Sequence, residues 1–119
     1  MLTDSEFVLA ADRTLAAIGA ALDAALDASA IDADWKINDG ILEIECDDGS
    51  KLIVNRHVPN REIWVAARAG GYHFAAVGGI WRDTRSGNEL GTALAELVRS
   101  QSGVDITLPP LAAPTASAG

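Results

Sequence analysis

The sequence is poor in the residues that most often carry catalysis or covalent cross-links. Its 119 residues include one cysteine, one methionine and two histidines. The single Cys46 excludes an intrachain disulfide, and its phase with Leu42 and Ile44 predicts a buried core thiol. No apolar run approaches the roughly 20 residues that span a bilayer, and the first residues lack the regions of a signal peptide. We therefore expect a cytoplasmic protein that does not enter a membrane.

Basic residues are also scarce, and the acidic ones are crowded into one part of the chain. There are 9 Lys and Arg against 17 Asp and Glu, giving a net charge of −8. Residues 1–50 hold 12 of the 17 acids and only Arg13 and Lys36 as bases. Because phosphate binding needs a basic surface, nucleic acid is not an expected partner. Ordinary solubility charge explains the sign but not the crowding, which favours an acidic face that attracts cations or a basic partner.

Apolar periodicity predicts a long first helix. Thr3 and Glu6 have the spacing of a capping box. Apolar residues then recur at helical spacing through about Asp27, at Phe7, Ala11, Leu15, Ile18, Leu22 and Leu26. Gly19 lies inside this helix, where it costs about 1 kcal/mol relative to alanine. A local bend is expected there.

Alternating runs separated by turn residues predict strands at 34–38, 41–46, 51–55, 62–67, 72–76 and 80–83. A second helix follows, with Asn88 or Ser86 as its cap and Gly103 at its end, and residues 104–108 are expected to pack back in an extended conformation. The predicted fold class is α+β, a two-layer α-β sandwich. Its antiparallel sheet has five to six strands, and the N- and C-terminal helices pack on one face. We expect one domain at 1–108 and a disordered C-terminal tail at 109–119.

Trp64 is out of phase with Ile63 and Val65, so a strand that buries those two residues directs the indole away from the core. Asn55 has the same outward phase and can share this face. An exposed aromatic beside an amide and charges is typical of a protein-binding surface. The alternative is a tryptophan half-covered by a neighbouring strand.

The order of these elements, together with several short motifs, resembles the frataxin family. The resemblance covers about residues 3–108. Its motifs are Asp39-Gly40-Ile41-Leu42, Asp48-Gly49-Ser50-Lys51, Ile53-Val54-Asn55-Arg56, Pro59, Ile63-Trp64, Gly70-Gly71-Tyr72-His73-Phe74, Trp81 and Ser86-Gly87.

The resemblance implies a protein of iron-sulfur cluster assembly that binds ferrous and ferric iron weakly and reversibly and is not an enzyme. It would act as an iron-responsive regulator, and as an iron donor, on the cysteine desulfurase and the scaffold protein. It would be a monomer that can form oligomers with iron. Its iron and desulfurase surface matches Asp23, Asp27, Asp32 and Asp34 (the acidic ridge), with Asp4, Glu6 and Asp12 nearer the start. Its second surface, on the sheet, matches Asn55, Arg56, His57 and Trp64.

The chemistry of the acidic ridge agrees with that implication. Asp23 and Asp27 are neighbours on one helix face, and Asp32 and Asp34 share a strand face. Repulsion among such carboxylates is relieved by a multivalent cation, without a preformed cage. Hard oxygen ligands select poorly among iron, manganese, calcium and magnesium. Members of the family commonly carry additional acids along this helix, whereas this chain has Gly19, Ala20, Ala24 and Ala28 on or beside that face. We therefore expect weaker or fewer iron sites than in a typical relative.

Two other functions stay open at the level of sequence. One is a pure interaction protein whose iron binding is incidental, and the other is a ferroxidase, for which no fixed diiron constellation is evident. His57 and His73 lie in sheet-face or surface positions and are not expected to be catalytic.

Overall fold

The computed structural model describes residues 2–115, which begin with a long capped helix. Helix α1 (Asp4–Asp27) starts after Thr3, whose Oγ1 accepts a hydrogen bond from the backbone N–H of Glu6 at 3.1 Å. In return, Oε1 of Glu6 accepts from the backbone N–H of Thr3 at 3.0 Å, so both halves of the capping box are formed. The predicted start and end of this helix are therefore confirmed.

Six strands form one antiparallel sheet in sequence order. They are β1 (Asp34–Asn38), β2 (Ile41–Glu45), β3 (Lys51–His57), β4 (Glu62–Ala67), β5 (Gly70–Val77) and β6 (Ile80–Asp83). Each strand pairs with the next one along the chain, as short turns permit in a meander. Helix α2 (Leu90–Ser102) follows.

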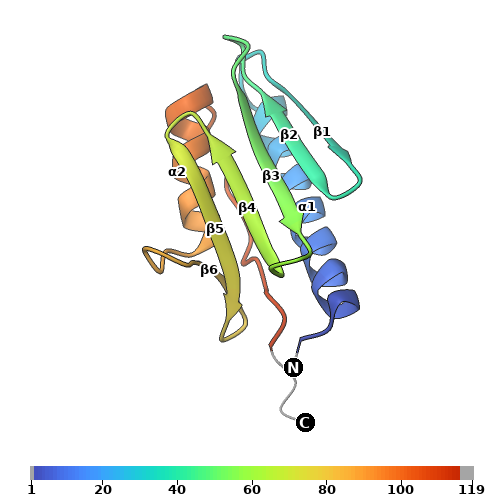
Figure 1. Ribbon diagram of the computed structural model, residues 1–119. Helices are drawn as coiled ribbons and strands as arrows, with labels where there is room; N and C mark the ends of the chain where they lie inside the picture. Colours follow the sequence, from blue (N-terminus) through green and yellow to red (C-terminus); the bar gives the residue numbers. More distant parts are fainter. Residues whose placement is uncertain (1, 116–119) are drawn as a thin grey trace.

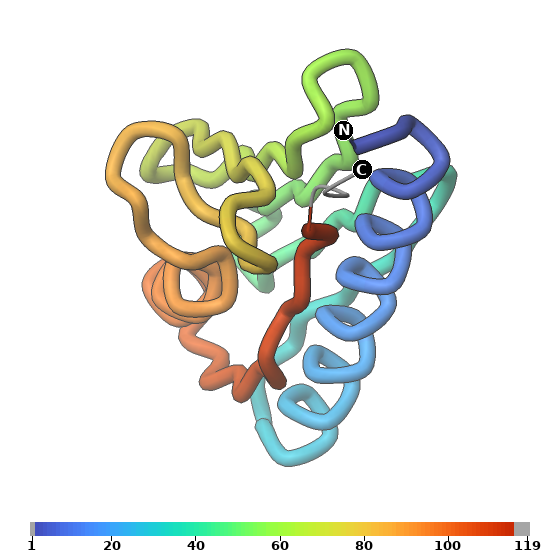
Figure 2. Tube along the Cα trace, turned by 90° about the horizontal axis from the view of Figure 1, so that it is seen from below, coloured from blue at the N-terminus to red at the C-terminus, as the bar shows by residue number. Residues whose placement is uncertain are grey.

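Both helices lie on the same face of this sheet, behind it in Figure 1. The predicted α+β two-layer sandwich is thus confirmed. Figure 2 shows the layers from below, with the two helices apart and the C-terminal segment between them. Among residues 2–115, no helix covers the opposite face of the sheet, which we call the open face.

The turn between β1 and β2 shows why the hairpin needs its Asp-Gly pair. Asp39 and Gly40 both have positive φ, 50° and 77°, as a two-residue hairpin turn with the right twist requires. A β-carbon at Gly40 would also lie 2.6 Å from Nε of Arg56. Glycine at this position therefore allows both the positive φ of the turn and the close approach of the Arg56 side chain.

The second helix is capped differently from the prediction. Its N-cap is Glu89, whose carboxylate accepts from the backbone N–H of Gly91 at 3.1 Å. Ser86 is unavailable because it donates to Oδ2 of Asp83 at 2.8 Å and accepts from the backbone N–H of Asn88 at 3.2 Å. Within residues 2–115, neither helix is long and apolar enough to cross a membrane.

The core lies between the sheet and the helices and is organised around Trp81. This indole is fully buried and meets Phe7 edge-on, with ring centroids 5.9 Å apart. Its Nε1 donates to Oγ1 of Thr14 at 3.0 Å, and that hydroxyl donates to the carbonyl of Ala10 at 3.0 Å. The polar atoms that the helix brings into the core are therefore satisfied.

The predicted disordered tail is wrong for residues 109–115. Leu111 and Ala113 are 3% and 8% exposed, and the backbone N–H of Ala113 donates to the carbonyl of Gly79 at 2.9 Å. Ala112 forms an isolated bridge with Ile80. The segment fills the space between the helices (Figure 2), and burial of its few apolar side chains outweighs its Pro-Ala composition. Residues 116–119 of the predicted tail lie outside the described residues.

Candidate functional site

Trp64 lies on the open face, as its phase predicts. Ile63 and Val65 are buried beneath the sheet, whereas Trp64 is half-buried on the other side. Strand register places Asn55 directly opposite Trp64 on β3 and His73 directly opposite it on β5. The open face therefore carries a row of polar and aromatic side chains across three strands.

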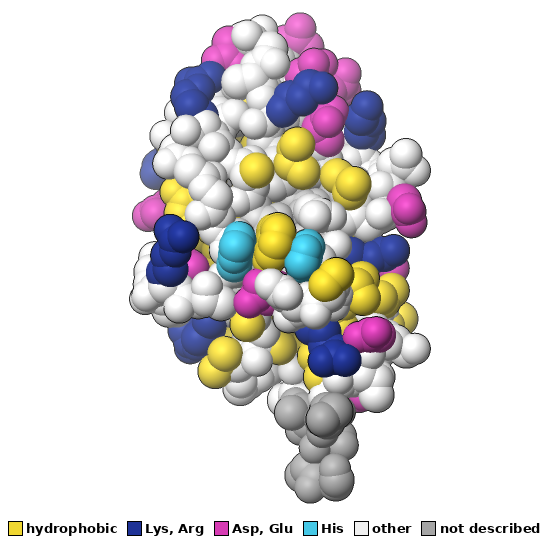
Figure 3. All heavy atoms as spheres, in the orientation of Figure 1, with side chains coloured by type: hydrophobic (Ala, Val, Ile, Leu, Met, Phe, Trp, Pro, Cys, Tyr) yellow, Lys and Arg dark blue, Asp and Glu magenta, His cyan; other side chains and the backbone are white. Residues whose placement is uncertain are grey.

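Trp64 is stacked between two histidines. The ring of His57 lies 3.5 Å from the indole at an interplanar angle of 8°, and the ring of His73 lies 4.2 Å away at 9°. Figure 3 shows the two histidines on either side of a hydrophobic side chain on this face. Both faces of the indole are covered by histidine rings, so the accessible part of the side chain is its edge. Phase alone did not predict this aromatic stack (His57, Trp64 and His73), because it depends on cross-strand register.

Glu62, on the same strand and face as Trp64, holds the aromatic stack in place through its carboxylate. Its Oε1 accepts a hydrogen bond from Nε1 of Trp64 at 2.8 Å and lies 3.9 Å from Nδ1 of His73. Glu62 is also the direct cross-strand neighbour of His57, whose own Nδ1 is buried without a hydrogen-bond partner among the described residues. The open face thus presents a pre-ordered group of rings around one carboxylate.

Arg56 does not lie on this face, contrary to the predicted sheet surface. It is in phase with the buried Val54, and its guanidinium pairs with the carboxylate of Asp12 on α1 and, at 3.6 Å, with that of Asp39. Alternation along β3 is the reason: Asn55 and His57 point to the open face, and the residue between them points to the helix side. Arg56 links the helix to the sheet.

The acids of the first half of α1 are occupied within the domain. Asp4 pairs with Nε of Arg61 at 2.9 Å, and Asp12 pairs with Arg56. Glu6 completes the helix cap, and its hydrogen bonds with Thr3 lower the pKa of its carboxyl group. These carboxylates therefore stabilise the fold and contribute less to an outward negative field.

The acids of the acidic ridge have a different environment. Asp23, Asp27, Asp32 and Asp34 are exposed, and none of them has an ion-pair partner among the described residues. Asp23 accepts one hydrogen bond, from the uncharged Nε1–H of Trp35 at 2.8 Å. The second half of the helix and the following strand therefore keep their negative charge.

Further carboxylates extend the acidic ridge along the edge of the sheet. Asp34 on β1 is directly opposite Glu45 on β2, which places like charges side by side at a cost in stability. A hollow of about 320 Å³ is lined by Asp32, Asp34, Glu45 and Asp47. Sequence reasoning missed Glu45 and Asp47, because only the register of β1 and β2 brings them to this edge.

These carboxylates do not form a ready-made metal cage. Within residues 2–115, no three His, Cys, Asp or Glu side chains are grouped closely enough to hold a metal ion. The predicted core position of Cys46 is confirmed, since it is 4% exposed. Any cation at the acidic ridge would be bound by exposed carboxylates together with water.

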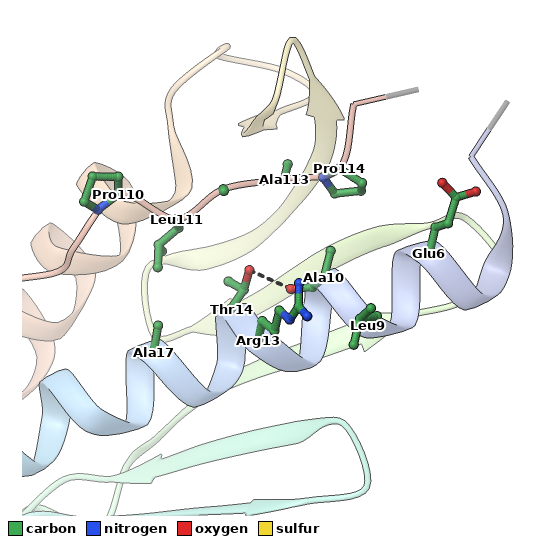
Figure 4. Close-up of a pocket in the computed structure, with 11 residues that line it drawn as sticks. Glu6, Leu9, Ala10, Arg13, Thr14, Ala17, Pro110, Leu111, Ala113 and Pro114 are labelled. Atoms are coloured by element: carbon green, nitrogen blue, oxygen red, sulfur yellow. Dashed lines mark hydrogen bonds between the residues drawn. The ribbon is translucent and has the colours of Figure 1, made fainter. Parts of the chain in front are cut away.

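A groove between α1 and the C-terminal segment has a different character. It has a volume of about 420 Å³, and Figure 4 shows the helix on one side and residues 110–114 on the other. Its lining is mainly apolar, with Leu9, Ala17 and Leu111, and its charged members are Glu6 and Arg13. The hydroxyl of Thr14, which also lines the groove, is engaged within the fold, since it donates to the carbonyl of Ala10 and accepts from Nε1 of Trp81.

Comparison with known proteins identifies relatives over most of the chain. The family model of the frataxin-like domain matches residues 1–104. The iron-sulfur cluster assembly protein CyaY of Cupriavidus metallidurans is 48% identical over 109 residues, which cover 90% of this chain and 96% of the relative. The structure of frataxin from Psychromonas ingrahamii matches with a TM-score of 0.73 at 31% identity, covering 88% of this chain and 96% of that one. Trimeric frataxin from the yeast Saccharomyces cerevisiae, complexed with ferrous iron, matches with a TM-score of 0.68 at 26% identity, covering 76% and 83%.

Proposed function

The chain belongs to the frataxin family, and we propose that it acts in iron-sulfur cluster assembly as an iron-binding regulator that can also donate iron. The observation that carries the proposal is the division of its acids. In the first half of α1, Asp4 and Asp12 are paired with arginines and Glu6 is used in the helix cap, whereas the acids of the acidic ridge are exposed and have no ion-pair partner within residues 2–115. Unpaired like charges cost stability, and a bound cation relieves that cost. The relative bound to ferrous iron supports iron as the cargo.

Iron binding is proposed to be weak and reversible. Carboxylates are hard ligands that suit iron, manganese, calcium and magnesium alike, and selectivity among them is low without a rigid cage. The alanines at positions 20, 24 and 28 reduce the number of carboxylates along the helix. We therefore expect ferrous iron to exchange freely between the acidic ridge and a partner.

The partners are proposed to be the cysteine desulfurase and the scaffold protein. The acidic ridge suits a basic surface, which its unneutralised charge would attract over several ångströms and orient on approach. The open face suits a second contact, centred on the exposed edge of Trp64 and on Asn55. Because the aromatic stack is already ordered by Glu62, little side-chain entropy is lost when a partner binds there.

We propose that the chain is not itself an enzyme. A ferroxidase needs carboxylates held in a fixed constellation around two irons, and the ridge acids are exposed side chains on the surface. The second candidate, a pure interaction protein with incidental iron binding, is favoured by the lack of a three-ligand cluster within residues 2–115. The iron-responsive regulator and the pure interaction protein differ in one respect: only for the regulator does iron change the effect of this chain on the partner.

The test is desulfurase-coupled cluster formation on the scaffold, followed by absorbance at several ferrous iron concentrations. We expect the chain to change the rate by an amount that depends on iron, and Asp27→Asn to weaken this dependence. Glu96→Gln removes one charge from an exposed position on α2 and serves as the matched control. An iron-independent effect would favour the pure interaction protein, and no effect of the folded chain at any iron level would overturn the proposed function.

A further inference from the structure

Trp35 joins the edge strand of the sheet to the last part of α1. Its indole lies on Gly19, where a β-carbon would be 2.6 Å from Cη2 and 2.7 Å from Cζ3. Its Nε1 donates a hydrogen bond to Oδ1 of Asp23, one turn further along the helix, at 2.8 Å. Glycine at position 19 is therefore what lets the ring approach the helix closely enough to reach that carboxylate.

The donor to Asp23 differs in kind from the donors to the other paired acids of α1. Asp4 and Asp12 accept from arginines, which cancel their charge. An indole N–H is a neutral donor with no acceptor capacity. Asp23 is thus held in one orientation while it keeps its negative charge, which is the condition for attracting a cation to a defined place.

The position of Trp35 also connects the two parts of the acidic ridge. Asp23 and Asp27 are on the helix, whereas Asp32 and Asp34 lie just before and at the start of β1. The side chain of Trp35 turns to the helix side of β1, and that of Asp34 turns to the open face. The indole is therefore a direct contact between the helix that carries Asp23 and the strand that carries Asp34.

We propose that Trp35 is a positioning residue of the acidic ridge: it orients Asp23 for a divalent cation, and its indole senses when the cation binds. This inference deepens the proposed function and rests on it. Groups that orient a ligand through a hydrogen bond commonly contribute 10-fold or more to metal affinity. At this exposed site we expect about a tenfold contribution.

The first test measures the dissociation constants of the unaltered chain and its variants for two metals by calorimetric titration. The metals are Mn²⁺, which is stable in air, and Fe²⁺ under anaerobic conditions. Trp35→Phe keeps an aromatic ring on Gly19 and removes the N–H. We expect its dissociation constant to rise about tenfold, while the control Trp64→Phe, on the opposite face, leaves the constant unchanged. Equal affinity of Trp35→Phe and the unaltered chain would overturn the positioning role.

The second test reads the indole directly and does not depend on removing it. In the Trp64→Phe protein the remaining tryptophans are Trp35 and the fully buried Trp81, so a saturable change of emission with Mn²⁺ is expected to arise from Trp35. Asp23→Asn in the same background should abolish this change while circular dichroism stays the same. The inference fails if the change persists in Asp23→Asn.

The outcomes also separate this inference from the proposed function. If cluster formation responds to iron and Trp35→Phe responds in the same way, the function stands and the positioning role falls. If the unaltered chain neither binds the metals nor alters cluster formation, the proposed function falls, and the role of Trp35 falls with it.

Discussion

Arg56 on β3 pairs with Asp12 on α1, and the pair ties the helix to the middle of the sheet. The guanidinium is 20% exposed and the carboxylate 48% exposed, so the contact is partly shielded from water. An acid that looks like part of a continuous negative surface in the sequence is therefore a structural residue. The surface that can attract cations begins further along the helix.

This division predicts opposite effects for two acids of the same helix. Asp12→Asn should lower the free energy of unfolding by about 1 kcal/mol, because it leaves Arg56 without its helix partner. It should leave the affinity for Mn²⁺ nearly unchanged. Asp27→Asn should weaken Mn²⁺ binding without lowering stability, because its exposed carboxylate has no ion-pair partner within residues 2–115 and lies at the C-terminal end of α1, where negative charge is unfavourable. Urea unfolding and calorimetry on both variants measure this contrast, which would be absent if all acids of α1 belonged to one metal surface.

Gly19→Ala is predicted to destabilise the protein although alanine is the better helix former. Propensity alone favours alanine by about 1 kcal/mol. The added β-carbon would lie 2.6 Å from Cη2 of Trp35, so the indole must move. Overpacking of this kind costs about 1–3 kcal/mol. In a Trp35→Ala background the sign should reverse and Gly19→Ala should stabilise. Urea unfolding of the unaltered chain, the two single variants and the double variant measures these effects. If Gly19→Ala changes the free energy of unfolding in the same direction in both backgrounds, the packing contact is not the cause.

Trp64→Arg is predicted to weaken binding of the partner and also to lower stability moderately. The substitution removes two stacked contacts with His57 and His73, and aromatic pairs are worth about 0.5–1.5 kcal/mol each beyond their buried area. We expect a loss of about 1–2 kcal/mol in urea unfolding with an unchanged circular dichroism spectrum. Ala66→Arg, on the same strand and open face, controls for added charge and should cost much less.

Leu111→Ala is predicted to lower the free energy of unfolding by about 2–3 kcal/mol, as for other buried leucines. Its side chain is 3% exposed between the helices. Leu9→Ala is the matched control, because Leu9 is 54% exposed and should cost little. Chemical denaturation of both variants measures the difference. Equal, small losses would show that the C-terminal segment does not belong to the folded domain in solution.

Asp48 is predicted to contribute to stability in a pH-dependent way. Hydrogen bonds from Ser50, with a further contribution from Arg68, lower the pKa of Asp48 from 3.8 to about 2. Because the folded state favours the carboxylate, this contribution is complete above about pH 4 and is lost as the pH falls through about 2. The difference in urea midpoint between the unaltered chain and Asp48→Asn should therefore shrink over that interval. A difference that stays constant from about pH 5 down to about pH 2 would contradict this contribution.

The sequence alone determined the elements and the directions of many side chains, because these depend on periodicity over a few residues. The capping box at Thr3 and Glu6, the outward phase of Trp64 and the burial of Cys46 all followed from local pattern. The crowding of acids in residues 1–50 was equally visible. The short sequence motifs also indicated the resemblance to the frataxin family.

Only the tertiary structure decided which of those residues work together. Arg56 and Asp12 are 44 positions apart, and the pairing of Trp35 with Gly19 and Asp23 joins a strand to a helix. The aromatic stack depends on the register of three strands, and the burial of Leu111 depends on a space left between two helices. Such contacts arise when separate elements pack, and a local pattern fixes the face of each element but not what lies opposite it. The charge of the sequence therefore predicted an acidic surface, and packing determined which carboxylates remain free to bind.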